Sequence, residues 1–303
     1  MIFRYPLLCL PLLAACAGPH ADTPLTCSVQ RVAEVPLTLR DGFLTVGASI
    51  DDKPVTMLVD TGTERTIVTP STVEALRLDR DRHRNTTIYG IGGASFGANA
   101  KIQSFGFGGY EMLDQSYAVG PLNPHQPENG ILGADWLSLF DVEIDVPHHR
   151  MALYQAEGCE GHYIPWHGPY TDLEHVHVQG NDLLNFPVQL AGQPLTALLD
   201  SGANATQITQ SAAARLGVDD AAMAHDPASQ SVGIDQTRLS MHRHRFPEMV
   251  VGAEHFPSVV LPVGAVQVPD ADMLLGADFL RSRRVWLSYT TQQVFIQRST
   301  PAG

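Results

Sequence analysis

The chain has 303 residues, 44% hydrophobic and 17% charged, which fits one large or two smaller globular domains and excludes a disordered chain. Asp and Glu number 32 against 19 Lys and Arg, so the formal net charge is -13 and nucleic-acid binding is not expected. The 26 Gly and 21 Pro separate short apolar runs, which favours strands and turns over long helices.

The N-terminus has the pattern of a signal peptide. Arg4 precedes an apolar stretch that is too short to span a bilayer as a helix. Residues 13–16, LAAC, are similar to a bacterial lipobox, in which the cysteine becomes the lipidated first residue of the mature protein. We therefore predict a lipoprotein signal peptide over 1–15 and lipidation of Cys16. The alternative is an ordinary secretory signal cleaved near Ala15.

The segment after the signal is predicted to be a tether over 16–29, since it lacks periodicity. It implies a lipid-anchored protein of the cell envelope, facing the periplasm. Ala17 and Gly18 follow Cys16, and the lack of an Asp directly after the cysteine favours the outer membrane over the inner if the source is Gram-negative. Cys9 leaves with the signal, which leaves Cys27 and Cys159 as a pair in an oxidising compartment. A disulfide between them would join the two ends of the first lobe, and two free thiols are the alternative.

The body of the chain contains an internal repeat. In each copy an apolar, strand-like run ends in Asp-Thr/Ser-Gly: KPVTMLVDTG from Lys53 and QPLTALLDSG from Gln193. A helix-like stretch follows each run, STVEALRL from Ser71 and SAAARLGV from Ser211, with the serine in the position of an N-cap.

Each copy also carries an apolar-apolar-Gly motif. Gly133 follows Asp60 by 73 residues, and Gly276 follows Asp200 by 76. A strand-like run begins seventeen residues past each of these two glycines. Such ordered agreement is hard to obtain by chance, and it predicts two equivalent lobes. Their bounds are expected at 30–156 and 171–298, with a Gly-, His- and Pro-rich linker over 157–170.

These motifs resemble those of the two-lobed aspartic peptidases of the pepsin/retropepsin clan, most of all single-chain bacterial relatives of the retroviral proteases. The resemblance covers most of residues 30–298. It implies an all-β, bilobal acid-protease fold, with two homologous β-barrel-like lobes and the active site at their interface. In that family each lobe supplies one Asp from a loop threaded by its apolar-apolar-Gly segment. Asp60 and Asp200 would therefore be the catalytic pair, a monomer would be sufficient for activity, and no metal or other cofactor is implied.

Paired carboxyls suit amide hydrolysis, because one can deprotonate water while the other protonates the carbonyl oxygen. Two carboxyls about 3 Å apart cannot both ionise, so they share a proton. The alternative for both aspartates is a surface Asp-Gly turn, which the apolar strands leading into them disfavour. The residues expected to support the pair are Thr61, Gly62, Thr63, Ser201 and Gly202. Glycine lets backbone N–H groups approach the carboxylates, and by the resemblance the Thr61 and Ser201 hydroxyls cross-link the two loops.

The third position after each aspartate differs between the copies. Thr63 matches the hydroxyl of pepsin-type enzymes, whereas Ala203 matches the retroviral type. A hydroxyl bonded to a carboxylate favours its charged form. From this mixture we expect a mildly acidic to near-neutral pH optimum.

A Gly-rich segment in the first copy resembles the retroviral flap, whose backbone binds an extended peptide as an added strand would. It comprises Tyr89, Gly90, Ile91, Gly92 and Gly93. A plain Gly-rich hairpin is the alternative, and Tyr89 is as consistent with core packing as with contact to substrate. The corresponding segment of the second copy, 231–235, carries one Gly, so we do not expect it to form an equal second flap.

Other polar motifs are given structural interpretations. The His pairs within 148–149, 175–177 and 242–244 are expected on solvated strand faces, not around a metal, since no Cys or acidic partner has ligand-like spacing. Asp135 and Asp278 follow the glycines of the two apolar-apolar-Gly motifs. They are expected to hydrogen-bond to loops and not to act in catalysis.

The sequence thus predicts an aspartic endopeptidase of the bacterial cell envelope that acts on a peptide or protein substrate. A lipoprotein that only binds peptides in the same cleft is the second hypothesis, and it would not need two intact Asp-Thr/Ser-Gly turns. A two-carboxylate glycoside hydrolase is disfavoured, because such enzymes do not need equivalent motifs from two halves of the chain.

Overall fold

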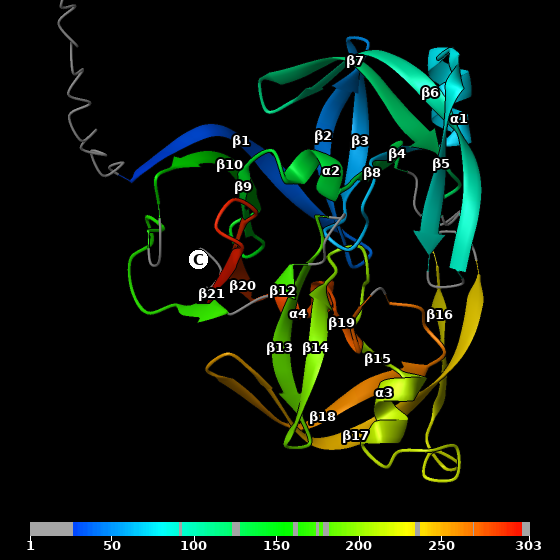
Figure 1. The fold of residues 1–303 in the computed structure, drawn as a ribbon, viewed down its shortest axis with the longest axis vertical. Helices are drawn as coiled ribbons and strands as arrows, with labels where there is room; N and C mark the ends of the chain where they lie inside the picture. Colours follow the sequence, from blue (N-terminus) through cyan, green and yellow to red (C-terminus); the bar gives the residue numbers. More distant parts are fainter. Residues whose placement is uncertain are drawn as a thin grey trace, which may run out of the picture.

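The computed structural model describes residues 27–90, 93–122, 128–159, 163–173, 176–177, 182–233, 237–268 and 270–298. Two lobes of β-structure lie one above the other, the first coloured blue to green and the second green to red (Figure 1). In the described residues the strands form sheets of 13 and 8. The predicted all-β, two-lobed architecture is confirmed.

The described residues of the first half of the chain form ten strands and two short helices. They are β1 (Ser28–Arg40), β2 (Phe43–Ile50), β3 (Lys53–Val59), β4 (Ile67–Val68), α1 (Pro70–Leu76), β5 (Arg80–Gly90), β6 (Gly93–Phe107), β7 (Tyr110–Val119), β8 (Gly130–Leu132), α2 (Ala134–Leu137), β9 (Asp141–Asp145) and β10 (Arg150–Glu157).

The second half repeats much of this order. Its elements are β11 (Thr171–Leu173), β12 (Val176–His177), β13 (Leu184–Leu190), β14 (Gln193–Leu199), β15 (Gln207–Thr209), α3 (Gln210–Arg215), β16 (Ala228–Val232), β17 (Arg238–Val251), β18 (Glu254–Gly264), β19 (Met273–Leu275), α4 (Ala277–Leu280), β20 (Arg283–Ser288) and β21 (Gln293–Arg298). Among the described residues, no helix is long and apolar enough to cross a membrane.

Strand β3, which leads into Asp60, is buried on both faces near its end. Met57 and Val59 point into the main hydrophobic core, whereas Leu58 belongs to a smaller apolar cluster with Ile67. Successive side chains of a strand point to opposite faces, so a continuous apolar run produces this double burial. The aspartate that follows is thereby held at a fixed place inside the molecule.

The two equivalent helices begin two residues earlier than the sequence predicts. Thr69 caps α1, its Oγ1 accepting a hydrogen bond from the Thr72 N–H at 3.1 Å. Thr209 caps α3 in the same way through the Ala212 N–H, also at 3.1 Å. The predicted serine caps were wrong because threonine, an equally good acceptor, precedes each serine by two residues in extended backbone.

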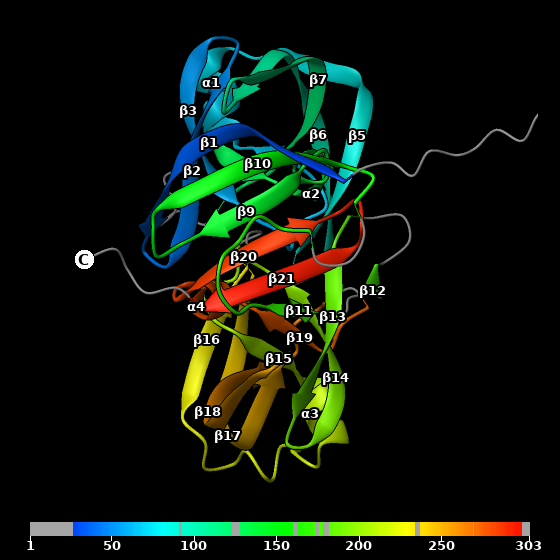
Figure 2. The same ribbon diagram turned by 90° about the vertical axis from the view of Figure 1, so that its left-hand side faces the viewer.

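The lobes are joined by a sheet that takes strands from both. Strand β9 of the first lobe pairs antiparallel with β20 of the second, Ile144 opposite Val285. On the outer sides lie β10 and β1 from the first lobe and β21 and β11 from the second. In Figure 2 the red strands β20 and β21 lie beside β9 and β10 across the middle of the molecule. This sheet fixes the position of one lobe relative to the other.

Of the expected linker, 157–170, Glu157 belongs to β10 and Cys159 forms the disulfide, and the described residues 163–170 pack on the outer face of this sheet. Trp166 is buried, and its ring meets that of Trp286 edge to face at 6.3 Å. Tyr163 contacts the same ring and donates a hydrogen bond to Asp141 Oδ2 at 2.5 Å. The segment therefore covers buried carboxylates of the sheet as well as connecting the lobes.

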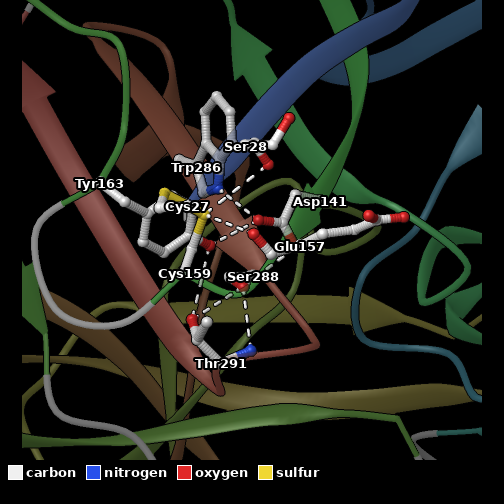
Figure 3. The surroundings of a disulfide bond; sticks show 9 residues. All are labelled: Cys27, Ser28, Asp141, Glu157, Cys159, Tyr163, Trp286, Ser288 and Thr291. Carbon is white, nitrogen blue, oxygen red and sulfur yellow. Dashed lines mark hydrogen bonds between the residues drawn. A yellow bond between two sulfur atoms is a disulfide. The ribbon is translucent and has the colours of Figure 1, made fainter. Parts of the chain in front are cut away.

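The predicted disulfide between Cys27 and Cys159 is confirmed. It lies just before β1 and just after β10, which pair antiparallel from Ser28 opposite Glu157. Figure 3 shows the bond close to Tyr163 and Trp286 at the end of the joining sheet. The bond thus ties together the two ends of the first lobe.

Replacing both cysteines with serine is expected to lower the free energy of unfolding by about 2–4 kcal/mol, because the bond restricts the unfolded chain over a sequence separation of 132. Urea denaturation of the chain without its signal peptide would measure this loss. Wild-type protein treated with a reductant is the control and should match the double variant. An unchanged unfolding midpoint would contradict the structural role of the bond.

Candidate active site

Each aspartate of the repeated motif lies at the end of a central strand. Strands β3 and β8 run parallel, and the Asp60 N–H donates to the Leu132 carbonyl at 3.1 Å. Strands β14 and β19 repeat this arrangement, with the Asp200 N–H donating to the Leu275 carbonyl at 3.0 Å. The apolar-apolar-Gly segments thus hold the backbone of both aspartates.

The threading glycines pass through spaces that exclude a side chain. A Cβ on Gly133 would lie 2.6 Å from the Arg65 carbonyl carbon, and one on Gly276 would lie 2.6 Å from that of Ala205. Thr66 Oγ1 accepts the Gly133 N–H at 3.2 Å, and Thr206 does the same for Gly276 at 3.1 Å.

The aspartates that follow these glycines bond loops, as the sequence predicted. Asp135 Oδ1 accepts the N–H and hydroxyl of Thr66 at 2.8 and 2.7 Å. Asp278 Oδ1 accepts the same two groups of Thr206 at the same distances. Each carboxylate holds the loop of its own lobe through these two hydrogen bonds.

The two aspartate loops are cross-linked through Thr61 and Ser201. The Thr61 N–H donates to Ser201 Oγ at 3.0 Å, and Thr61 Oγ1 donates to the Leu199 carbonyl at 2.7 Å. In the opposite direction, the Ser201 N–H donates to Thr61 Oγ1 at 3.1 Å, and Ser201 Oγ donates to the Val59 carbonyl at 2.7 Å. Both side chains are buried, so these four bonds fix the spacing of the loops in a dry environment.

The two carboxyls lie against each other across the interface and form a side-chain hydrogen bond. A Cβ on Gly62 would lie 2.5 Å from Asp200 Cγ, and one on Gly202 would overlap the Asp60 carboxyl. Only glycine leaves room for the opposite aspartate at these positions. The N–H groups of Gly62 and Gly202 each donate at 2.9 Å to the Oδ1 of the aspartate in their own lobe.

Burial and mutual repulsion alter the acidity of the pair. Burial raises the pKa of Asp60 well above its ordinary value, and the neighbouring charge of Asp200 raises it further. Burial also raises the pKa of Asp200, but N–H groups of Gly202 and Ala203, both at 2.9 Å from its Oδ1, oppose that rise. The pair therefore retains one proton, which the two carboxyls share, at a pH where an ordinary aspartate has lost its own.

The third position after each aspartate acts through the backbone. The Ala203 N–H bonds to Asp200, and the Thr63 N–H lowers the pKa of Asp60. From the sequence we predict this influence for the Thr63 hydroxyl, whereas the structure assigns it to the backbone N–H. A backbone donor is present whatever the side chain, so the difference between Thr63 and Ala203 has less effect on the pair than its residue types suggest.

A cleft of about 670 Å³ opens above the two carboxyls and lies between the lobes. The hairpin of β5 and β6, whose strands pair up to Gly90 opposite Gly93, lines it on the first-lobe side. Of the predicted flap, Ile91 and Gly92 lie outside the described residues, and the side chain of Tyr89 is likewise not described. Gly93 has a φ of 115°, a conformation that favours glycine at the turn.

A second hairpin, of β16 and β17, lines the cleft from the other lobe through Ser231 and Gly233. The two hairpins approach each other at the right of Figure 1. The single glycine of this segment predicts that it does not form an equal second flap. The structure gives it the equivalent place, since strand pairing and not glycine content positions the hairpin.

Several residues that line the cleft are not among those predicted from the sequence, for example Phe43 and Leu183. Each precedes the aspartate of its lobe by seventeen residues, so the internal repeat could have paired them. The sequence does not reveal that both face the cleft, because that depends on how β2 and β13 sit in their sheets.

Two histidines of the His pairs named in the sequence lie beside carboxylates. His148 Nδ1 lies 2.8 Å from Asp145 Oδ1, and His244 Nδ1 lies 2.7 Å from Asp226 Oδ2. In the described part of the chain, no group of three or more His, Cys, Asp or Glu side chains could hold a metal ion.

Family comparisons match both halves of the chain. Residues 46–136 match the family model described as "Aspartyl protease", and residues 186–282 match "gag-polyprotein putative aspartyl protease". No curated protein matches this sequence. Among solved structures, the aspartic proteinase from Irpex lacteus has a similar fold, with a TM-score of 0.52 and 14% sequence identity over 90% of this chain and 98% of that one.

These comparisons confirm the bilobal acid-protease fold. Each half of the chain matches an aspartyl protease model over the segment that holds its Asp-Thr/Ser-Gly turn and its apolar-apolar-Gly motif. The chain is therefore an aspartic-type peptidase, a hydrolase whose two halves each supply one aspartate loop.

Proposed function

We propose that the protein is an aspartic endopeptidase whose catalytic residues are Asp60 and Asp200. One observation carries the proposal: two carboxyls, one from each lobe, share a hydrogen bond at the base of a cleft that two hairpins line, with Asp60 buried and Asp200 half-buried. A protein that only bound peptides would gain nothing from burying two acidic groups side by side, since their repulsion costs stability.

The single proton that the pair retains gives the two carboxyls complementary roles. The ionised carboxyl takes a proton from the attacking water, while the protonated one gives its proton to the carbonyl oxygen of the substrate. Water adds to the carbonyl carbon and forms a gem-diol. The first carboxyl then protonates the leaving nitrogen, the second recovers a proton from the gem-diol, and the C–N bond breaks. The pair returns to its starting state without a covalent intermediate.

The cleft suits a substrate in extended conformation. The strands of both hairpins end beside it, so their backbone groups are placed to bind a peptide lying between them. Incubating the protein with an unfolded protein substrate between pH 3 and 8, and sequencing the products, tests the proposal. We expect cleavage at internal bonds and inhibition by a statine-type peptide. Binding of such peptides without any product would favour the peptide-binding alternative.

We further propose that the mature protein is attached to a bacterial membrane through a lipid on Cys16 and faces the periplasm. The lipobox-like sequence and the disulfide support this proposal, since disulfides form in oxidising compartments. The first strand begins at Ser28, so a short segment would separate the anchor from the folded body.

Cys16→Ser is expected to move the protein from the membrane fraction to the soluble fraction of lysed cells, because a serine cannot take the thioether-linked lipid. Immunoblots of the two fractions would measure this change. Incorporation of a labelled fatty acid into the wild type, and not into the variant, is the positive control. A variant that stayed in the membrane fraction would contradict lipid anchoring.

A further inference from the structure

The two halves of the cleft differ where the internal repeat makes them comparable. In the first lobe Val68 of β4 pairs with Val119, and in the second Ile208 of β15 pairs with Val263. Each of the residues Val68 and Ile208 follows its aspartate by eight positions and points into the main core. The residue before each one faces the opposite side, which is the cleft. That residue is Ile67 in the first lobe and Gln207 in the second.

The hairpins give a second comparison of the same kind. Val119 and Val263 are equivalent, since each pairs with the core-facing residue named above. From these two residues the strand registers lead to equivalent pairs in the hairpins: Thr86 opposite Gly97 in the first lobe, and Ser229 opposite Met241 in the second. Two residues further along each hairpin, Ile88 and Ser231 are therefore equivalent, and both line the cleft. At two matched positions the hydrocarbon side chains of one lobe are replaced by an amide and a hydroxyl in the other.

In the first lobe the two isoleucines form a single apolar surface. A Cβ on Gly120 would lie 2.9 Å from Ile88 Cδ1 and 3.2 Å from Ile67 Cγ2, so the two side chains converge on one point. They belong to one buried apolar cluster, against which Phe43 packs. This half of the cleft offers a substrate side chain dispersion contacts and burial of apolar surface.

In the second lobe Gln207 presents a polar group at the corresponding place. Its side chain is only 6% exposed, and within the described chain no protein group hydrogen-bonds to its amide. The amide nitrogen and oxygen are accessible from the cleft, so a ligand that supplies a donor or an acceptor can bind them there. Ser231 on the hairpin adds a half-buried hydroxyl to the same half of the cleft.

The remaining polar side chains on this side carry no charge. Asn204, Gln230 and Gln267 line the cleft there, and Gln230 and Gln267 are exposed. Apart from Asp200, the described residues that the second lobe contributes to the cleft are uncharged. The other charged side chains of the cleft, Glu64 and Arg65, come from the first lobe. On the second-lobe side an acidic substrate group therefore finds no cation, and a basic group finds no carboxylate other than the catalytic pair.

We propose that Gln207, assisted by Ser231, is a specificity-determining residue, and that the second-lobe half of the cleft selects an uncharged hydrogen-bonding side chain, an amide or a hydroxyl. The first-lobe half takes an apolar side chain through Ile67 and Ile88. The substrate class is thus an extended peptide with an apolar residue on one side of the cleft and Gln, Asn, Ser or Thr on the other. This inference rests on the proposed peptidase activity.

A peptide library randomised on both sides of the scissile bond, with products identified by mass spectrometry, tests the assignment. For the wild type we expect Gln, Asn, Ser or Thr to be enriched at one position. Individual peptides carrying one of these residues there should have a kcat/KM at least about tenfold higher than the same peptide with Leu. Gln207→Leu should abolish or reverse that ratio while still cleaving the Leu peptide, and Gln207→Asn should keep the preference. Gln155→Leu removes an exposed amide from β10, away from the cleft, and is the matched control.

The outcomes separate this inference from the proposed activity. Cleavage with an unchanged preference in Gln207→Leu, or enrichment of Asp or Glu in the wild type, would overturn the inference and leave the peptidase standing. If no peptide is cleaved, the proposed activity fails, and equilibrium binding of the same individual peptides then decides the inference. A tenfold binding preference for the amide peptide that Gln207→Leu removes would support the role of Gln207, and equal affinities would overturn it.

Discussion

Replacing either Asp60 or Asp200 with asparagine is expected to lower kcat/KM for peptide hydrolysis at least about 10³-fold. Each carboxyl performs a proton transfer that an amide cannot, and a positioned acid or base typically contributes 10²–10⁴-fold. The double variant should have about the same kcat/KM as the less active single variant, because the two groups act as a unit. Initial rates with a fluorogenic peptide would measure the effect. If both single variants turned over at the wild-type rate, the proposed mechanism would be wrong.

The same pair predicts a bell-shaped pH profile for the wild type. At low pH both carboxyls are protonated and no base is present, whereas above the raised pKa of Asp60 both are ionised and no acid is present. Since burial and the Asp200 charge raise the pKa of Asp60 well above 3.8, the basic limb extends into less acidic conditions than an ordinary aspartate allows. The mildly acidic to near-neutral optimum that the sequence predicts stays a prediction, and the same profile tests it.

Thermal unfolding separates a chemical defect from a folding defect. An aspartate with a pKa higher in the folded chain than in the unfolded chain binds more protons when folded. Its contribution to stability is complete below the unfolded value, near 3.8, and is lost as the pH rises through the folded pKa. Asparagine removes this pH-dependent loss. Asp60→Asn should therefore unfold at pH 7 at a temperature equal to or above that of the wild type, although it is inactive.

The internal repeat predicts much of the candidate site, because local sequence determines it. The buried strand, the Asp-Thr/Ser-Gly turn and the threading glycine recur at matched spacing, and each imposes the same backbone path in both lobes. The replacement of Ile67 by Gln207 was also visible in the repeat. Its meaning was not, since only the registers of β4 and β15 show that these residues face the cleft and not the core.

The joining sheet could not be predicted in this way. The alternation of Asp141, Glu143 and Asp145 with apolar residues is typical of a strand with one face in water. In the structure all three carboxylates are buried, because Arg284 from β20 and Trp166 from the linker cover that face. Arg284 and Glu143 are 141 residues apart in the sequence, and no local pattern predicts such a pairing.

This buried face contains an ion pair between the lobes. Glu143 has no exposed surface; its Oε1 accepts from Arg284 Nε at 2.8 Å and from Arg150 Nη2 at 2.5 Å. Its Oε2 accepts from the Tyr154 hydroxyl at 2.9 Å. Arg284 belongs to the second lobe, so its bond to Glu143 helps to hold the lobes in the position that brings Asp60 against Asp200.

Glu143→Gln is expected to lower the free energy of unfolding by about 2–3 kcal/mol, because Arg284 and Arg150 lose their nearest buried carboxylate and keep the longer contacts to Asp145, at 3.8 and 3.3 Å. The loss of activity at 25 °C should be smaller than that of Asp60→Asn, since the fold persists, but inactivation should begin at a lower temperature. Urea denaturation and residual activity after heating would measure both effects. Glu34→Gln is the matched control: Glu34 pairs with the same Arg150 at 3.4 Å but is 41% exposed, so its loss should cost no more than about 0.5 kcal/mol. Equal effects of the two substitutions would show that burial of Glu143 between the lobes does not strengthen their association.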